Sequence, residues 1–413
     1  MAPPSLPSYL DPDVLPKLLE NVNDHVQALS SGDLKARDAA IEACRTLAST
    51  LESPSEAFVR MTWVEPSHLS AMRVALGMGL FEQLAADNGA PKSSAQLAAL
   101  CSADPRLVGK IVKVLAAVGT VREVDADSYV PSPLSLSMTR SIFSDSLSLM
   151  HDFCIPINLK TADFFAKNGY QYPADPLSAP AQFAHNVMGK THIMQLYEEH
   201  GQAQRFGSMM ATWMMGRPHW SDNSFYPVQE RLVQGATGDH DSVFLVDVGG
   251  STGHDLSAFL ALHPLGTFPG HLVVQDRAEV IDTIPKGSLS AGIQPMAHDF
   301  FTPQPVQGAR TYFLHNIIHD WDDDKSRQIL KNLAAAMKKG YSKLLLWEYV
   351  LPAKNSPPTL SALDWEMMSF WAASERSDGH WRSLLEDPEI GLKVNGFWNY
   401  SQYDQTVIEA ELA

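Results

Sequence analysis

The sequence predicts an α/β protein in which an all-α domain with a winged-helix pattern precedes a Rossmann-like domain. From Val243 onward, short apolar runs alternate with helix-like segments, as in a parallel sheet that is covered on both faces. Between Ser70 and Val130, helical periodicity gives way to two short strand-like runs. A chain of 413 residues has room for both domains.

Composition argues against partners that carry negative charge. The chain has 47 acidic and 31 basic residues, and its formal charge of −16 opposes binding to nucleic acid or to anionic lipid. Its three cysteines match neither a disulfide framework nor a zinc pattern. No apolar run approaches the roughly 18 residues of a membrane span, and the first ten residues do not resemble a signal peptide. We therefore expect a cytoplasmic protein that binds neither nucleic acid nor membrane.

The N-terminal part divides into two predicted segments. Residues 1–60 form a helical extension, because apolar positions recur at helical spacing. Residues 61–139 contain the helical run AMRVALGMGLFEQLAA, a helix with a serine cap, and a helix begun by Asp104 and Pro105. Two strands follow around the turn DADS, which completes a winged helix. We expect it to dimerise rather than bind DNA, because its recognition helix carries only three basic residues among apolar ones: Arg106, Lys110 and Lys113.

The remaining two predicted segments are residues 140–235 and 236–413. The first is helical, irregular and rich in Phe, Met and Trp. Most of these side chains belong to an ordinary core, although a methionine-rich wall also suits a flat hydrophobic ligand. The second segment is the Rossmann-like domain.

A glycine-rich turn joins the first strand of this domain to its first helix. The run LVDVGGSTGHDLSAFL lacks the dinucleotide fingerprint G-x-G-x-x-G, but it lets a ligand approach the backbone at the carboxyl edge of the sheet. After the second strand, Asp276 can accept hydrogen bonds from two ribose hydroxyls, or it can cap a helix. The run HDFF then offers a polar group and an aromatic face to an adenine ring, with core packing as the alternative for Phe300.

Several motifs in order resemble the plant caffeate-type and fungal class I O-methyltransferases, which use S-adenosylmethionine. The matches cover about residues 243–398, and the winged-helix pattern extends the resemblance to about residue 60. Such a series is specific, whereas a single member of it is not. The matching runs are LVDVGGSTGHDLSAFL, VVQDRAEVI, AHDFF, LHNIIHDWDDDKSRQIL, LLLWEYVLP and SERSDGHWRSLLEDPEIGLKV.

The resemblance implies a cofactor site and its residues. In the family, the positions of Gly249, Asp276, Asp299 and Phe300 hold S-adenosylmethionine. The position of His315 is more often lysine or arginine in plant relatives. Together with the neighbouring loop residues, the predicted cofactor set is Asp247, Gly249, Gly250, Gly253, Asp276, Asp299, Phe300 and His315.

His319 is the predicted general base. It follows an apolar strand, which places it at the carboxyl edge of the sheet, and by resemblance it matches the catalytic base of the family. Glu348 ends the next strand and can orient the imidazole, while Glu375 matches a second flanking carboxylate. The structural alternatives are that His319 with Asp320 caps the next helix, and that Glu348 pairs with a surface lysine.

The predicted acceptor is a hydroxyl of an aromatic or polyketide-like small molecule. By analogy with the family, the pocket is formed by apolar side chains of two segments, a residue of a second subunit often enters it, and the protein is a homodimer. No metal is expected, because no cluster of carboxylate ligands is recognisable. The predicted pocket residues are Phe153, Phe206, Met209, Trp213, Met367 and Met368.

Two other functions stay open. Some fungal proteins that resemble O-methyltransferases are pericyclases, in which bound S-adenosylmethionine assists dehydration or cyclisation without methylation. The presence of His319, Glu348 and Glu375 favours methyl transfer over that chemistry. A non-catalytic regulator would bind the cofactor without turnover of any acceptor.

Overall fold

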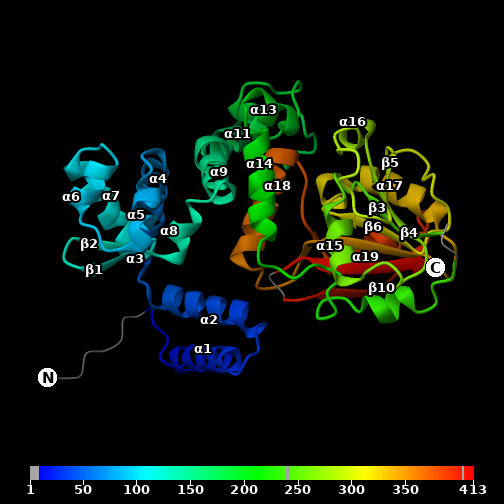
Figure 1. The fold of residues 1–413 in the computed structure, drawn as a ribbon, viewed down its shortest axis with the longest axis horizontal. Helices are drawn as coiled ribbons and strands as arrows, with labels where there is room; N and C mark the ends of the chain where they lie inside the picture. Colours follow the sequence, from blue (N-terminus) through cyan, green and yellow to red (C-terminus); the bar gives the residue numbers. More distant parts are fainter. Residues whose placement is uncertain (1–8, 239–241, 402–403) are drawn as a thin grey trace. The chain divides into compact units, whose positions relative to one another are not determined.

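The computed structural model describes residues 9–238, 242–401 and 404–413, so the proline-rich start falls mostly outside the described residues (Figure 1). The chain forms two compact units. The first, here called the helical unit, consists of Met1–Gln171 and Pro180–Met215. The second, here called the sheet unit, consists of Tyr172–Ala179 and Gly216–Ala413.

Membrane insertion has no candidate helix in the described parts of the chain. None of the helices there combines the length and the apolar character that a membrane span requires.

The helical unit begins with an antiparallel helix pair, α1 (Leu15–Ser30) and α2 (Ala36–Leu51), as predicted from the helical spacing. A helix with a π-helical stretch in its middle follows, made of α3 (Pro54–Val59), η1 (Arg60–Val64) and α4 (Glu65–Gly77). Large apolar side chains are exposed along this stretch: Phe58, Val59, Met61, Trp63 and Val64.

Three further helices and a hairpin form the next part of the helical unit. The expected caps are confirmed, since Ser93 accepts a hydrogen bond from the Gln96 N–H and Asp104 accepts from the Arg106 N–H. The single helix expected over AMRVALGMGLFEQLAA is wrong, because Gly79 adopts a positive φ of 72° and separates α4 from α5. The elements are α5 (Leu80–Gly89), α6 (Ser94–Leu100), α7 (Pro105–Ala117), β1 (Val121–Asp125) and β2 (Ser128–Pro131).

The rest of the helical unit is helical, as predicted for the segment from residue 140. The helix α14 packs on α9, and the Thr212 hydroxyl donates a hydrogen bond to the Ile142 carbonyl at 3.0 Å. The elements are α8 (Pro133–Ser137), α9 (Ser141–Leu149), η2 (Met150–Cys154), α10 (Ile155–Asn158), α11 (Thr161–Lys167), α12 (Pro180–Ala184), α13 (Ile193–Glu199) and α14 (Ala203–Met214).

The sheet unit is built on a seven-stranded sheet with the strand order β10-β11-β7-β6-β3-β4-β5. Its five strands β3 to β7 are parallel to one another, and the parallel arrangement was predicted from the four apolar runs that form β3, β4, β6 and β7. The strands are β3 (Val243–Val248), β4 (His271–Asp276), β5 (Ile293–Ala297), β6 (Thr311–His315), β7 (Lys343–Glu348), β10 (Leu392–Asn399) and β11 (Thr406–Leu412).

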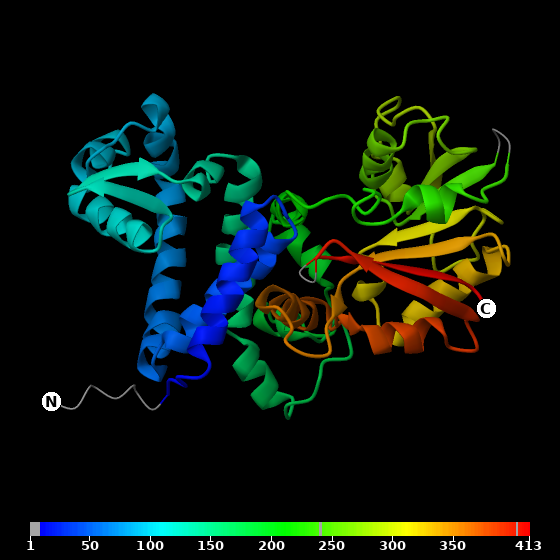
Figure 2. The ribbon, with the colours of Figure 1, turned by 90° about the horizontal axis from the view of Figure 1, so that it is seen from below.

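The expectation of a parallel sheet is wrong at one side. The C-terminal strands β10 and β11 form a hairpin that adds to β7 in the antiparallel direction, and Figure 2 shows these red strands beside the orange β7. The sheet is therefore mixed.

Alternate residues of each strand point to opposite faces of the sheet. Helices and loops cover both faces and bury most of these side chains. On one face, Tyr312 and Leu314 of β6 pack in a core with the helices α17 and α19. On the other face, Phe313 stacks on Trp220 with 4.8 Å between the ring centroids. The connecting elements are η3 (Gln229–Val233), α15 (His254–Leu262), α16 (Ala278–Ile281), η4 (Ile318–Asp320), α17 (Asp323–Ala336), β8 (Val350–Leu351), α18 (Pro358–Trp371), β9 (Arg376–Ser377) and α19 (Asp378–Leu385).

The strand order reverses at β3. From β3 the chain continues to β4 and β5 on one side and then returns to β6 and β7 on the other. Sheets of this kind bind ligands at the carboxyl ends of the strands beside such a reversal. All the predicted cofactor and catalytic residues lie at or shortly after the carboxyl end of a parallel strand, except Glu375, which precedes β9.

Candidate functional site

The glycine loop after β3 is open because side chains are excluded from it. Gly249 has a φ of +79°, and a Cβ atom there would lie 2.6 Å from the Ile317 Cδ1 atom. A Cβ atom on Gly250 would collide with the carboxylate of Asp247. The N–H groups of Gly249 and Gly250 donate to the Gln275 carbonyl at 2.8 and 2.9 Å, which fixes the loop against β4. The loop thus offers bare backbone at the edge of the sheet.

Asp247 is a buried carboxylate that lacks a hydrogen-bond partner within the described structure. The residue is 1% exposed, and neither of its carboxylate oxygens has a partner there. Burial, and then the charges of Asp255 and Asp276, raise its pKa well above the usual value. An unpartnered buried carboxylate destabilises the fold, so a hydrogen-bond donor from a ligand fits this position.

Asp276 ties the end of β4 to the glycine loop. One carboxylate oxygen accepts from the Ser251 N–H at 2.9 Å, and the other accepts from the Arg277 N–H at 2.8 Å. The helix-cap alternative is wrong, because the N-cap of α16 is Arg277 and not Asp276. The carboxylate therefore lies directly beside the loop.

The predicted adenine-binding residues follow β5. Asp299 is exposed and accepts a hydrogen bond from the Phe301 N–H at 3.0 Å. The Phe300 ring is partly buried against Trp321, with 6.1 Å between the ring centroids. A ring carbon of Phe300 lies 3.8 Å from the position that a Cβ atom on Gly249 would take. The structure thus brings this ring to the glycine loop.

His315, at the end of β6, is held by a residue that sequence reasoning missed. Its Nδ1 lies 2.8 Å from a carboxylate oxygen of Asp255, its ring stacks on Trp347 at 4.1 Å, and its Nε2 lies 3.3 Å from Gln405. Burial alone would raise the pKa of Asp255, but the surrounding histidines, His315 first among them, hold it far below its usual range. Asp255 directly follows His254 in the loop motif, and its buried carboxylate was not recognisable from the sequence.

Three residues of the kinds that bind metal ions lie close together around Asp255 in the described structure. One ligand-type atom each from His254, Asp255 and His315 lies within 4.8 Å of the others. The hydrogen bond between Asp255 and His315 already satisfies two members of the group.

His319 lies on the short 3₁₀ turn η4 and is 8% exposed. Its Nδ1 lies 2.9 Å from an oxygen of Glu375, and its Nε2 lies 3.5 Å from an oxygen of Asp320. Burial would lower the pKa of His319, but the charges of Glu375, Asp320 and Glu348 raise it to about 10. The geometry therefore stabilises a protonated imidazole.

Glu348 contacts the backbone of the turn and not the imidazole. Its Oε1 accepts from the N–H groups of Ile317 and Ile318 at 3.1 and 2.8 Å. The surface-lysine alternative is wrong, because Glu348 is fully buried. The capping alternative for His319 is also wrong, since Asp322 caps α17 by accepting from the Lys325 N–H.

The predicted acceptor-pocket residues fall into two groups. Within the helical unit, the rings of Phe153 and Phe206 each pack on Tyr197, at 5.1 and 4.7 Å. Met209 and Trp213 lie on α14 of the same unit. In the sheet unit, α18 carries Met367 and Met368. A pocket that joins the two groups stays a prediction.

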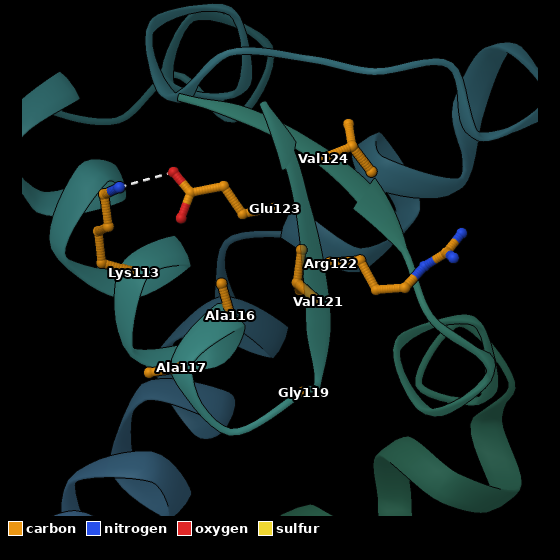
Figure 3. Close-up of a pocket in the computed structure, with 8 residues that line it drawn as sticks. All are labelled: Lys113, Ala116, Ala117, Gly119, Val121, Arg122, Glu123 and Val124. Carbon is orange, nitrogen blue, oxygen red and sulfur yellow. Dashed lines mark hydrogen bonds and ion pairs between the residues drawn. The ribbon is translucent and has the colours of Figure 1, made fainter. Parts of the chain in front are cut away.

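A surface hollow lies elsewhere, on α7 and the β1 strand of the helical unit (Figure 3). The ion pair between Lys113 and Glu123, at 2.6 Å, borders it. None of the predicted cofactor, catalytic or acceptor-pocket residues lines this hollow. The hollow therefore gives no support to the predicted catalytic site. The lining residues are Lys113, Ala116, Ala117, Gly119, Val121, Arg122, Glu123 and Val124.

Comparison with known proteins places this site in a family. The sequence pattern of the O-methyltransferase domain matches residues 236–389. The O-methyltransferase mpaG of Penicillium brevicompactum is 32% identical over 397 residues, which cover 96% of this chain and 98% of that protein. The O-methyltransferase ATR12 of Stachybotrys chlorohalonatus is 33% identical over 407 residues, which cover 96% of this chain and 98% of that protein.

Solved structures share the fold. The structure of LepI in complex with SAM has a TM-score of 0.83 at 23% identity and covers 96% of this chain and 99% of its own. OxaC in complex with sinefungin and meleagrin has a TM-score of 0.77 at 24% identity, over 97% and 99%. These similarities show a class I methyltransferase fold. With relatives 32% and 33% identical over nearly its whole length, the chain belongs to the O-methyltransferase family.

Proposed function

We propose that this protein transfers a methyl group from S-adenosylmethionine, the methyl donor of its family, to a hydroxyl of an aromatic or polyketide-like small molecule. The observation that carries the proposal is the buried pair of His319 and Glu375, joined at 2.9 Å. It lies at the carboxyl edge of the sheet that also carries the glycine loop and Asp247, whose carboxylate has no hydrogen-bond partner among the described residues. A base and a cofactor cradle at one edge are what methyl transfer to oxygen requires.

The residues at the glycine loop fit the cofactor. Bare backbone at Gly249, Gly250 and Gly253 accommodates its chain, and the orphaned Asp247 carboxylate accepts from a donor group. Asp276 would receive ribose hydroxyls, while Asp299 and Phe300 would hold the adenine. His315 borders the same loop through Asp255. When bound, the cofactor supplies a methyl group on a sulfonium, whose positive charge opposes the protonated form of His319.

His319 would accept the hydroxyl proton at Nε2, because Nδ1 is engaged with Glu375. The carboxylates of Glu375, Asp320 and Glu348 then stabilise the imidazolium that forms, as they already do in the cofactor-free protein. Glu348 contributes by holding the backbone of the turn. A base in this position typically increases a rate by about 10² to 10⁴.

The four-part division at residues 60, 139 and 235 is part of the proposal. The hairpin β1–β2 after α7 supports a winged-helix dimerisation domain. Homodimerisation is supported by the exposed apolar stretch around Met61 and Trp63, which are 53% and 70% exposed. The acceptor pocket would combine Phe153, Phe206, Met209 and Trp213 with Met367 and Met368.

We further propose a cytoplasmic enzyme that needs no metal. Cys44, Cys101 and Cys154 form no disulfide within the described residues, as a reducing compartment allows. The hydrogen bond from His315 occupies Asp255, which weakens the case for a metal at that group. Turnover that is unchanged in the presence of a chelator supports this, and loss of turnover that added metal restores contradicts it.

The proposal is tested by incubating the purified protein with methyl-labelled S-adenosylmethionine and a panel of phenolic and polyketide-like alcohols. Mass spectrometry then follows labelled ether and S-adenosylhomocysteine. Equal amounts of both establish O-methylation. An acceptor that is consumed without label, while the cofactor stays intact, contradicts it.

A second candidate is a pericyclase or dehydratase on the same fold. It is favoured by the likeness to a structure described as a pericyclic reaction enzyme, with a TM-score of 0.83 and 23% identity over 97% of this chain and all of that one. A protonated His319 would then polarise a carbonyl or assist loss of water. The labelled-methyl experiment separates the two candidates.

A further inference from the structure

Arg376, the residue after Glu375, binds the backbone of the turn that carries His319. It lies on β9 and is 2% exposed. Its Nη1 donates to the Ile318 carbonyl at 2.9 Å, and its Nη2 donates to the Trp321 carbonyl at 2.7 Å. The two carbonyls flank His319 in the chain, so one guanidinium spans the turn from end to end.

The guanidinium itself is fixed from its other side. Nε and Nη2 donate to one carboxylate oxygen of Asp323 at 3.1 and 3.0 Å, and Nη2 also donates to the Ser326 hydroxyl at 3.1 Å. The second oxygen of Asp323 pairs with His380 at 2.9 Å. This planar fork of donors is specific to arginine, and the ammonium of a lysine cannot reproduce it.

The turn is therefore held on both of its backbone edges. Glu348 accepts from the N–H groups of Ile317 and Ile318, and Arg376 binds the carbonyls of Ile318 and Trp321. Because Glu375 and Arg376 are consecutive, the segment that binds the backbone of the turn also presents the carboxylate to the imidazole. A shift of the turn along β9 would change the contact of 2.9 Å between His319 Nδ1 and Glu375 Oε1.

We propose that Arg376 is a positioning residue. It fixes the turn relative to β9, so that His319 stays hydrogen-bonded to the Glu375 carboxylate. Its effect on catalysis rests on the proposed function, whereas its hold on the imidazole does not. Other charged groups that face His319 are Asp320, on the same turn, and Glu348, at the end of β7. None of these binds the carbonyls of the turn within the described structure.

The variants separate positioning from charge and from general stability. Arg376→Gln removes the fork, and Arg376→Lys keeps the charge without the fork. His380→Gln is the matched control, because it removes the other partner of Asp323 and leaves the carbonyls of the turn bound to Arg376. Thermal unfolding and binding of S-adenosylhomocysteine show that each variant is folded, and Arg376→Lys replaces Arg376→Gln if the latter does not fold.

The first readout is nuclear magnetic resonance of ring-labelled histidine in the cofactor-free protein, with the His319 signals assigned from His319→Gln. Loss of a nearby cation alone would raise the pKa of His319. Loss of positioning separates the imidazole from Glu375, so we expect Arg376→Gln to lower this pKa by about one unit or more. His380→Gln should leave it unchanged. A His319 pKa that is unchanged or raised in Arg376→Gln overturns the proposal.

The second readout is catalysis on an acceptor from the labelled-methyl panel. We expect kcat to fall about 10- to 100-fold in Arg376→Gln, with partial recovery in Arg376→Lys and a KM for acceptor within about twofold of the wild type. An unchanged kcat, or a loss confined to KM, contradicts positioning. If the wild-type protein transfers no methyl group, the proposed function fails, and the histidine titration still decides the role of Arg376.

Discussion

The turn that carries His319 and the loop that carries Asp247 lie at one edge of the sheet but differ in how far their buried polar groups are hydrogen-bonded within the protein. His319 is bonded to Glu375, and Glu348 and Arg376 bind the backbone of the turn. Both carboxylate oxygens of Asp247 are buried without a hydrogen-bond partner in the described structure. Glu348 and Glu375 at the turn each keep one hydrogen-bonded oxygen, and only their Oε2 atoms lack a partner among the described residues, whereas neither oxygen of Asp247 has one there.

This difference indicates separate roles for the turn in catalysis and for the loop in cofactor binding. A base that is held before any ligand arrives costs no reorganisation when the reaction occurs. An unpaired carboxylate, by contrast, lowers the stability of the free protein, and a bound ligand recovers that stability. Substitutions in the turn should therefore change rates, and substitutions in the loop should change cofactor affinity and stability.

The largest expected effect comes from removing the His319 side chain from the turn. His319→Ala removes the base, so the rate of labelled-methyl transfer should fall by about 10² to 10⁴, with cofactor affinity within about twofold of the wild type. His271→Ala, at the opposite end of the parallel strands, is the control and should keep full activity. Retention of most of the activity in His319→Ala would exclude this residue as the base.

A smaller effect concerns the pH dependence of the rate. Transfer requires neutral imidazole, so the rate at saturating cofactor should rise with pH through the pKa of His319. In the cofactor-free protein burial lowers this pKa, but carboxylate charges, with Glu375 the largest, raise it to about 10. Glu375→Gln removes one charge, so the midpoint of the pH–rate profile should fall by about one pH unit or more. The plateau rate at high pH should also fall, by about tenfold.

The pH profile is measured at saturating cofactor for the wild type, Glu375→Gln and the exposed control Glu389→Gln. The control should reproduce the wild-type midpoint. A midpoint that stays in place or moves upward in Glu375→Gln would show that this carboxylate does not set the basicity of His319.

The smallest effect concerns the loop. Burial raises the pKa of Asp247, and a carboxyl whose pKa is raised on folding costs stability once the pH exceeds its unfolded value. Asp247→Asn should therefore stabilise the cofactor-free protein by about 1–3 kcal/mol at neutral pH. It should also reduce the stabilisation gained from S-adenosylhomocysteine.

Urea unfolding with and without S-adenosylhomocysteine measures both effects, and Asp282→Asn, an exposed acid, is the control. A less stable Asp247→Asn protein would mean that the carboxylate has a partner in solution.

The strand ends were predictable from the sequence, because an apolar run followed by a polar residue marks the edge of a parallel sheet. Asp276 and His319 were placed in this way. The pairing of His319 with Glu375 spans 56 positions, and no local pattern specifies it, so it came only from the family resemblance. Asp255 and Arg376 were not predicted at all, because tertiary packing selects the partners of these charges.

Three of the strands escaped prediction for local reasons. Strand β5 lies at the edge of the sheet, contains Pro295 and is mostly exposed, so it has no apolar run. The hairpin of β10 and β11 has a bulge between Val394 and Gly396, which interrupts the alternation of apolar and polar residues. The antiparallel part of the sheet was therefore not predicted.

The division between turn and loop is tested most directly by calorimetric titration of S-adenosylhomocysteine into the wild type, His319→Ala and Asp276→Ala. We predict that His319→Ala binds within about twofold of the wild type, and that Asp276→Ala binds about 10- to 100-fold more weakly, because it loses a charged hydrogen-bond acceptor. Equal losses of affinity in the two variants would contradict separate roles for the turn and the loop.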